Sequence, residues 1–290
     1  MEQDVLRQAV IDAASTKKSP AGEEYSSLSL AGSKNLAKKH DISRRIVEIA
    51  ALEAGIIPER YQRNIGTVGI GGQLKLLNSA VGVVGAGGLG GFAIELLARM
   101  GVGRLFVVDD DVFSDSNLNR QLIAHEKNLD RPKADAAAKR ISEINGAVSV
   151  KAFFRRGDAV NLLKIFEECD LILDCLDNLT SRFELEKVSR QLGVVMVHGA
   201  IAGFLGQLAV IRPEHPVLEK IYGPLDDGKA DRGAEVQLGN PATTPAMLAS
   251  WQANEAVKIL AGLEGVLPED NMLIIDMQSG ESFRIEVSAG

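Results

Sequence analysis

A glycine-rich segment follows the first strand-sized apolar run of this 290-residue chain. Ala80–Val84 leads directly into GAGGLG at 85–90, which has the spacing GxGxxG, and a helical pattern follows it. In such a strand–loop–helix unit, free backbone N–H groups and the helix N-terminus point toward a phosphate. Gly85 permits the tight turn, Gly87 lets the backbone approach the phosphate, and Gly90 packs the helix against the strand.

A second strand pattern, 104–108, ends at Asp109, which lies 24 residues after Gly85. A carboxylate at that place can bind the two hydroxyl groups of a ribose. The two features together predict a nucleotide-binding domain of the Rossmann type. They do not distinguish NAD from ATP.

Two cations and a further acid follow along the chain. Arg120 lies in the segment 114–121, and Lys133 follows Arg-Pro. Asp177 lies in the segment DCLDN at 174–178, which begins at the end of an apolar strand. The carboxyl ends of parallel strands meet at one edge of a sheet, where open α/β folds bind ligands, so we expect these side chains to converge. Two cations and an acid beside a phosphate loop suit transfer at phosphorus better than hydride transfer.

The elements that position these residues alternate between strand and helix. An α/β fold is therefore predicted, with a Rossmann-like, mostly parallel sheet flanked by helices. The continuous apolar character of the strands indicates that helices cover both faces. The predicted strands are 80–84, 104–108, 148–154, 171–174 and 194–197, and the predicted helices end near 100 and span 132–144, 158–168 and 180–192.

The alternation of strand and helix patterns ends after residue 198. Strands are expected at 207–211, 272–276 and 283–287, in an antiparallel or mixed C-terminal extension. A Gly- and Pro-rich stretch, 222–245, precedes an amphipathic helix at 245–261, on which Trp251 is expected to lie in the core. Long stretches without periodicity in compact domains are usually functional or disordered.

Residues 1–59 are predicted to form a helical N-terminal extension, and residues 60–290 the nucleotide-binding domain. The segment 19–33 is rich in Ser and Gly and is expected to be a loop or linker, whereas 34–56 has the spacing of helix, turn, helix. A helical cap or a dimer arm is favoured over a DNA-binding unit because the chain is acidic.

Composition excludes several classes of protein. The net charge is −7 and only 4% of residues are aromatic, which makes nucleic-acid binding unlikely. No apolar run approaches the ~20 residues that cross a bilayer, and the polar N-terminus is no signal peptide. The two cysteines, Cys169 and Cys175, lack metal-ligand spacing. A cytoplasmic protein without a membrane segment is expected.

The motifs in this order resemble those of the ThiF/MoeB/HesA family, relatives of the ubiquitin-activating enzymes. The matching features are RYQRN at 60–64, GAGGLG, the acid at 109, SNLNRQ at 116–121, RPK at 131–133 and DCLDN at 174–178. The resemblance continues through 199–200 and the helix at 252–261, so it covers roughly residues 60–288. Each motif is weak alone, but the ordered set is specific.

The resemblance implies an ATP-dependent adenylyltransferase, in which a carboxylate oxygen attacks the α-phosphorus of ATP and pyrophosphate leaves. The implied substrate is the C-terminal glycine of a small ubiquitin-like sulfur carrier, similar to ThiS or MoaD, in thiamine or molybdopterin biosynthesis. A homodimer is implied too, because Arg63 would reach the triphosphate of the neighbouring subunit.

The same resemblance assigns the site residues. The implied catalytic residues are Arg63, Arg120 and Lys133, and Asp177 is implied to hold Mg²⁺. The implied nucleotide-binding residues are Gly85, Gly87, Gly88, Gly90, Asp109, Ser116, Asn117, Arg120, Gln121, Lys133, Asp177 and Asn178.

The chain departs from the family in its cysteines. Many members hold a structural zinc with two CxxC pairs, and some use a loop cysteine before the last helix. No cysteine follows Cys175, so zinc bound by four cysteines is not expected, and the loop 233–245 contains no thiol. We therefore expect the reaction to stop at the acyl-adenylate, with a separate sulfur donor acting on it.

Two other functions remain open from the sequence. The first is an enzyme that adenylates a different carboxylate, such as that of a peptide or a small acid. Alternatively, the chain is a nucleotide-sensing regulator whose N-terminal segment binds DNA or a partner. Retention of Arg120, Lys133 and Asp177 together favours catalysis.

Overall fold

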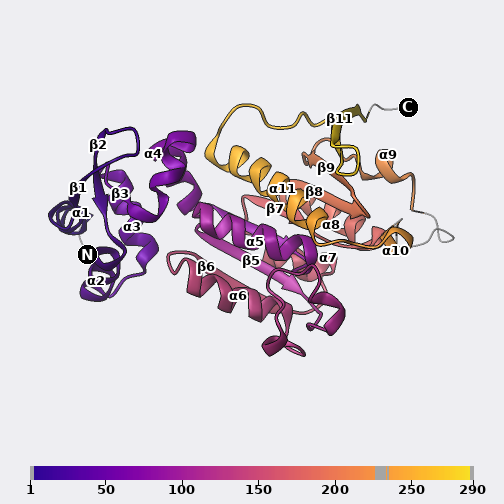
Figure 1. Ribbon diagram of the computed structural model, residues 1–290, viewed down its shortest axis with the longest axis horizontal. Coiled ribbons are helices and arrows are strands. Elements are labelled where there is room, and N and C mark those ends of the chain that lie inside the picture. The colour runs from indigo at the N-terminus through magenta and orange to yellow at the C-terminus, as the bar shows by residue number, and fades with distance from the viewer. Residues whose placement is uncertain (1–2, 226–232, 234, 288–290) are drawn as a thin grey trace.

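The fold is built around one large sheet with helices on both faces and a small N-terminal unit at one end (Figure 1). The computed structural model describes residues 3–225, 233 and 235–287. Within these residues no helix is long and apolar enough to cross a membrane.

The large sheet has eight strands in the order β11-β10-β9-β8-β7-β4-β5-β6. Strands β4 to β8 run parallel, and β9, β10 and β11 extend the sheet in antiparallel fashion. The predicted mostly parallel sheet with an antiparallel extension is thus confirmed. The bounds are β4 Ala80–Val84, β5 Arg104–Asp109, β6 Ser149–Phe154, β7 Leu171–Asp174, β8 Val195–Ala202, β9 Leu205–Ile211, β10 Asn271–Asp276 and β11 Glu281–Glu286.

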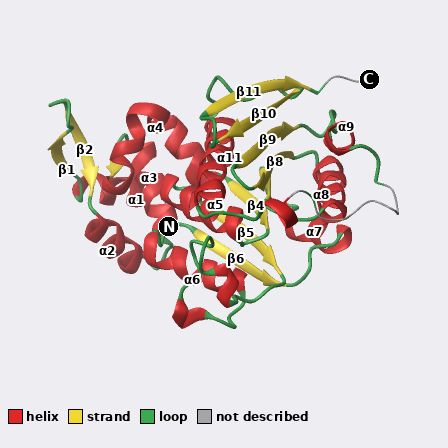
Figure 2. Ribbon diagram, turned by 45° about the vertical axis from the view of Figure 1, so that its right-hand side comes forward, coloured by secondary structure: helices red, strands yellow, loops and turns green. Residues whose placement is uncertain are grey.

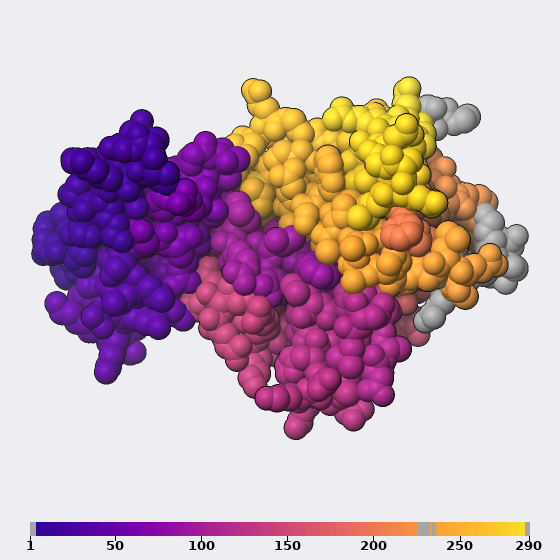
Figure 3. Space-filling view, in the orientation of Figure 1, coloured from indigo at the N-terminus to yellow at the C-terminus, as the bar shows by residue number. Residues whose placement is uncertain are grey.

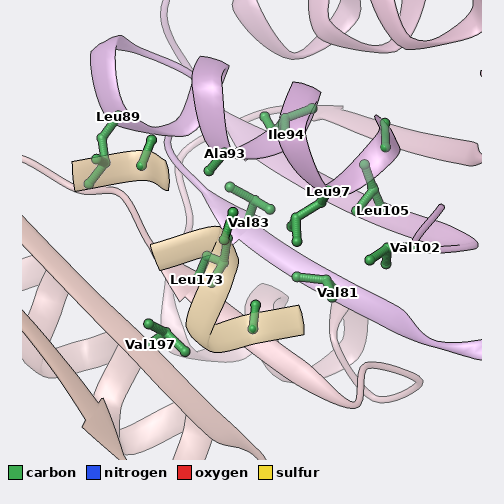
Figure 4. Close-up of a cluster of buried hydrophobic side chains, with 14 of the residues drawn as sticks. Val81, Val83, Leu89, Ala93, Ile94, Leu97, Val102, Leu105, Leu173 and Val197 are labelled. Atoms are coloured by element: carbon green, nitrogen blue, oxygen red, sulfur yellow. The ribbon is translucent and has the colours of Figure 1, made fainter. Parts of the chain in front are cut away.

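Helices cover both faces of this sheet, as the continuous apolar strands indicated (Figure 2). Alternate residues of a strand point to opposite faces, so β4 contributes to two separate cores. Val81 and Val83 face the helix α5 in one core (Figure 4), whereas Ala80 and Val84 belong to the other. One face carries α4 Gln62–Asn78, α5 Gly88–Met100, α6 Lys133–Ile144 and α11 Thr243–Ala261, and the other carries α7 Ala159–Ile165, α8 Leu179–Leu192 and α9 Leu218–Tyr222.

The strand order reverses direction at β4. From β4 the chain moves outward through β5 to β6, and it then returns to β7 on the other side of β4. The loops after β4 and β7 therefore diverge from neighbouring strand ends, and the gap between them is the place where open α/β sheets bind ligands. The fold alone locates the site there.

The N-terminal unit contains strands as well as the predicted helices. Its elements are α1 Gln3–Asp12, β1 Ser15–Lys18, β2 Glu24–Leu28, α2 Leu30–His40, α3 Arg44–Glu53 and β3 Ile57–Pro58. The expectation of a loop over 19–33 was wrong, because β2 and the start of α2 occupy most of it. Ser27 and Leu28 are buried, and Ser29 caps α2 by accepting from the N–H of Gly32. A strand rich in serine carries no apolar alternation, which hid it from the pattern.

Buried polar contacts join this unit to the rest of the chain, from which it projects as a lobe (Figure 3). Arg60 pairs with the buried Glu48 at 3.5 Å, and it also hydrogen-bonds the side chain of Asn145. Asn145 donates to the hydroxyl of Tyr61 at 2.9 Å. Burial raises the pKa of Glu48, although Arg60 acts in the opposite direction.

The segment before α11 includes the short helix α10 Glu235–Leu238, and part of the predicted stretch 222–245 lies outside the described residues. The prediction that Trp251 is buried was wrong, since its exposed fraction is 40%. α11 packs against α5 and the sheet through neighbours such as Leu248 and Gln252, both fully buried. Apolar residues occur on several sides of this helix, so the sequence did not mark which side is buried.

Candidate active site

The phosphate loop after β4 is shaped by two glycines that admit no side chain. Gly85 has φ +92°, and a Cβ there would lie 2.6 Å from the carbonyl oxygen of Cys175. A Cβ at Gly90 would lie 1.8 Å from the carbonyl oxygen of Gly85. Gly90 therefore lets α5 approach the loop, whereas Gly87 caps the N-terminus of α5 and leaves its N–H groups open to an anion.

A cavity of about 1060 Å³ opens at the carboxyl ends of β4, β5, β7 and β8. It brings together ten of the predicted site residues, which come from five separate segments. These are Gly85, Gly87, Gly88, Asp109, Asn117, Arg120, Gln121, Lys133, Asp177 and Asn178. Three predicted residues do not line it: Gly90, Ser116 and Arg63.

The carboxylate of Asp109 is fixed by backbone N–H groups on both sides. Its Oδ2 accepts from Ala86 at 2.6 Å and its Oδ1 from Asp111 at 2.8 Å. Burial raises the pKa of Asp109, while these two N–H groups and Lys133 act in the opposite direction. The acid is therefore oriented at the edge of the phosphate loop, where a ribose would lie.

Arg120 is held by the short segment that precedes it. Its Nη1 donates to the carbonyl oxygen of Ser116 and to the side chain of Asn119, both at 2.9 Å. Ser116 thus orients Arg120 through its backbone and does not line the cavity. Asn117 ends the 3₁₀ turn Asp115–Asn117, and its side chain accepts from the N–H of Ser114 at 3.1 Å.

Lys133 is the first residue of α6 and is 6% exposed. Its Nζ lies 2.9 Å from Oδ2 of Asp111, and its own N–H donates to the carbonyl oxygen of Asp111. A buried ammonium group is costly without a partner. Asp111 is the partner in this structure, and Lys133 also lines the cavity.

Asp177 and Asn178 lie in the loop between β7 and α8. Asn178 is the N-cap of α8 and accepts from the N–H of Ser181 at 2.9 Å. Its side-chain nitrogen lies 3.4 Å from Oδ1 of Asp177. Among the described residues no three His, Cys, Asp or Glu side chains gather to hold a metal ion. That Asp177 holds Mg²⁺ stays a prediction, and this ion is usually bound by one or two carboxylates together with phosphate oxygens and water.

Arg63 lies on α4, exposed and outside the cavity of its own chain. It is close enough to Tyr25 of the N-terminal unit to influence the ionisation of that hydroxyl. Within its own chain it does not line the cavity that contains the phosphate loop. Its predicted action on a neighbouring subunit stays a prediction.

The sequence missed several polar residues of the cavity wall. Arg182, Gln207 and Tyr222 line it, and so do Arg155 and Arg156 at the end of β6. The first three come from elements far apart in the chain, so no local spacing connects them. His198 lies behind them with 0% exposure.

The residues present suit a nucleotide. The side-chain oxygen of Gln121 is buried without a hydrogen-bond partner, and the same amide lies about 3.5 Å from where a Cβ of Gly87 would stand. Buried amides in proteins are nearly always satisfied. This oxygen only accepts, so a water molecule bound at the phosphate loop would supply the donor, while Arg120 and Lys133 supply positive charge for the phosphate itself.

Fold and cavity thus define a Rossmann-type nucleotide-binding protein with cations placed at its phosphate loop. Residues 61–289 match the ThiF family, so the chain belongs to the ThiF family. The resemblance drawn from the motifs is confirmed.

Named relatives fit the same family. The chain is 38% identical to the SAMP-activating enzyme E1 of Haloferax volcanii, over 75% of this chain and 81% of that protein. It is 32% identical to the sulfur carrier protein ThiS adenylyltransferase of Escherichia coli, over 77% of this chain and 88% of that protein.

Solved structures share the fold at low sequence identity. E. coli MccB with ATP has a TM-score of 0.69 at 18% identity, covering 80% of this chain and 72% of that chain. The microcin C7 biosynthetic enzyme MccB in complex with N-formylated MccA also has a TM-score of 0.69 at 18% identity. That likeness covers 99% of this chain and 89% of the other, so it includes the N-terminal unit.

Proposed function

We propose that this protein is an ATP-dependent adenylyltransferase that activates the C-terminal glycine carboxylate of a small ubiquitin-like sulfur carrier. The observation that carries the proposal is one cavity in which the phosphate loop, Asp109, Arg120, Lys133 and Asp177 meet. The relatives named above act on ThiS or are named for SAMP activation, which supports a carrier of this class. The thiamine and molybdopterin pathways are the proposed settings.

The geometry suits attack at phosphorus. A carboxylate oxygen of the substrate attacks the α-phosphorus of ATP, the bond to the bridging oxygen breaks, and the electron pair leaves with pyrophosphate. Arg120 and Lys133, held in place beforehand, stabilise the negative charge that accumulates on the leaving group. No general base is needed, because the attacking carboxylate is already ionised near pH 7. Mg²⁺ held by Asp177 would supply further charge neutralisation.

We further propose a homodimer in which Arg63 of one subunit reaches the triphosphate of the other. Its exposure on α4, outside its own cavity, supports that role. A separate sulfur donor would then act on the acyl-adenylate, and no zinc is expected. Both cysteines are unpaired, which suits the reducing cytoplasm.

A second candidate is adenylation of a carboxylate on a peptide or small acid. The structural likeness to MccB, named for microcin biosynthesis, covers 99% of this chain and so includes the N-terminal unit, which precedes the matched family segment. The third candidate, a nucleotide-sensing regulator, has no need of both cations and Asp177 in one cavity. Gel retardation with DNA at physiological salt tests it, and we expect no shift.

ATP–pyrophosphate exchange tests the proposal. We expect label from pyrophosphate to enter ATP only when a carrier protein ending in Gly-Gly is present. The same carrier without its final glycine is the matched control. Exchange with a short Gly-Gly peptide alone would favour the second candidate, and no exchange with any carrier encoded near this gene would refute the first.

A further inference from the structure

A buried polar network lies behind the loop that carries Asp177. The carboxylate of Asp174, at the end of β7, is 0% exposed and lies 2.6 Å from Nδ1 of His198. Nε2 of His198 lies 2.9 Å from the hydroxyl of Tyr222. Arg182 donates to that hydroxyl at 3.0 Å, and Gln207 bonds to it as well.

The donor and the acceptor of each hydrogen bond in this network can be assigned. Burial raises the pKa of Asp174, but Arg182 and the hydrogen bond from His198 outweigh it, and the pKa lies below its ordinary value. Asp174 is therefore an acceptor, and Nδ1–H of His198 donates to it. Nε2 then accepts a hydrogen bond from the hydroxyl of Tyr222, and the oxygen of that hydroxyl accepts hydrogen bonds from Arg182 and Gln207. The four elements β7, β8, β9 and α8 are thus linked to α9 through one hydroxyl.

The network hydrogen-bonds both peptide groups that flank Leu176, the one before it and the one after it. The N–H of Leu176 donates to Oδ1 of Asp174 at 3.0 Å, and its carbonyl oxygen accepts from Nη2 of Arg182 at 2.5 Å. Asp177 is the next residue. From the other direction Gln252 donates to the carbonyl oxygens of Asp174 and Val197, both at 2.8 Å.

We propose that Asp174, Arg182 and Tyr222 are positioning residues, which hold the Leu176–Asp177 backbone so that the Asp177 carboxylate meets Mg²⁺ on the nucleotide. This inference rests on the proposed function for the identity of the ligand. Arg182 orients the loop through the carbonyl of Leu176, and Tyr222 orients Arg182. A carboxylate that binds an ion through one loop needs such support, because sites tolerate errors of only about 0.5 Å.

A purely structural network is the competing explanation, and the two differ in what a mild substitution changes. A structural network lowers the melting temperature when it is weakened and leaves the metal requirement alone. A positioning network weakens the contribution of Mg²⁺ to ATP binding, because Asp177 touches the ion and the phosphate loop binds ATP without it.

Arg182→Lys is the sharper test. Lysine keeps the positive charge beside Asp174, but one ammonium group does not reproduce the planar fork that spans Leu176 and Tyr222. We expect Mg²⁺ to tighten ATP binding about tenfold in the wild type and by about twofold or less in the variant, each gain being measured against the same protein without Mg²⁺. Arg140→Lys is the matched control, because Arg140 makes two bonds to Glu95 away from the cavity.

Tyr222→Phe is the second variant and removes only the hydroxyl. It should reduce the Mg²⁺ gain to about threefold, less than the effect of Arg182→Lys, because Arg182 still reaches Leu176. Tyr61→Phe removes another buried hydroxyl that hydrogen-bonds a side chain. It should show the same Mg²⁺ gain in ATP affinity as the wild type. Calorimetric titration of ATP with MgCl₂ or with EDTA measures each gain, and thermal melting confirms folding.

Unchanged Mg²⁺ gains in both variants, whether or not their melting temperatures fall, would overturn the inference. The experiment contains no carrier protein. A wild type that shows the Mg²⁺ gain but no pyrophosphate exchange would therefore refute the proposed substrate and leave the positioning role standing.

Discussion

Three charged side chains of the cavity are held by contacts within the protein. Asp109 is gripped by two N–H groups, Arg120 by the carbonyl oxygen of Ser116, and Lys133 by Asp111. These contacts exist before a ligand arrives, so the side chains need little reorganisation when charge develops. Their residue types were readable from the sequence, whereas their holders, such as the carbonyl of Ser116, were not.

The two thiols are expected to be inert in the folded protein. Burial raises the pKa of Cys169 to about 12, and burial raises the pKa of Cys175 well above its ordinary value. The thiolate is the reactive form, so at pH 8 a thiol of pKa about 12 should be alkylated about a thousandfold more slowly than an ordinary one. Raising the pH increases the thiolate fraction, and reactivity should therefore appear only at strongly alkaline pH.

Iodoacetamide at pH 8, followed by mass measurement, tests these thiols. We expect no adduct and unchanged pyrophosphate exchange in the native protein, and two adducts after unfolding in urea. Rapid labelling of Cys175 in the folded state, with loss of exchange, would contradict this and would reopen covalent thiol chemistry.

At the scale of elements, the approach of α5 to the phosphate loop depends on Gly90. A Cβ at Gly90 would meet the carbonyl oxygen of Gly85 at 1.8 Å, and Gly85 is fixed to the sheet because its N–H donates to the carbonyl oxygen of Val108 in β5. Gly90→Ala should therefore lower the free energy of unfolding by about 3 kcal/mol or displace α5.

Gly91→Ala is the control for that substitution, one residue further along the same helix. A Cβ at Gly91 would meet its nearest atoms at 3.6 Å, which is an ordinary contact. Because alanine is a better helix residue than glycine, this variant should gain about 0.5–1 kcal/mol. Urea titration measures both, and equal stabilities of the two variants would show that α5 does not need the close approach.

The elements were predictable where apolar residues are patterned and were missed where polar contacts define them. All eight strands of the large sheet were predicted close to their observed positions, whereas the strand order, and with it the switch point between β4 and β7, comes from the structure. The strand β2 was missed because one of its buried residues, Ser27, is polar and is satisfied by a hydrogen bond to Glu59, which no apolar pattern indicates. Arg182 and Tyr222 were missed because they meet only through tertiary packing, 40 residues apart in the chain.

At the scale of the whole molecule, Arg63 stands at the junction of two parts. It lies on α4, near Tyr25 of the N-terminal unit, and outside its own cavity. If Arg63 completes a neighbour's site, the N-terminal unit must border that neighbour. The arrangement then accounts for the buried contacts that fix this unit to the domain, such as Arg60 with Glu48.

A mixed dimer tests the trans action of Arg63. Arg63→Ala and Lys133→Ala should each reduce pyrophosphate exchange by roughly a hundredfold or more as homodimers, because each site then lacks one cation. In a heterodimer, the Arg63→Ala subunit retains Lys133 and receives Arg63 from its partner, while the other site lacks both. Heterodimers isolated with two different affinity tags should therefore recover about half of wild-type exchange per dimer.

Action of Arg63 within its own chain predicts no recovery, because each site of the heterodimer then lacks one cation. Failure to isolate any heterodimer would contradict the proposed homodimer itself.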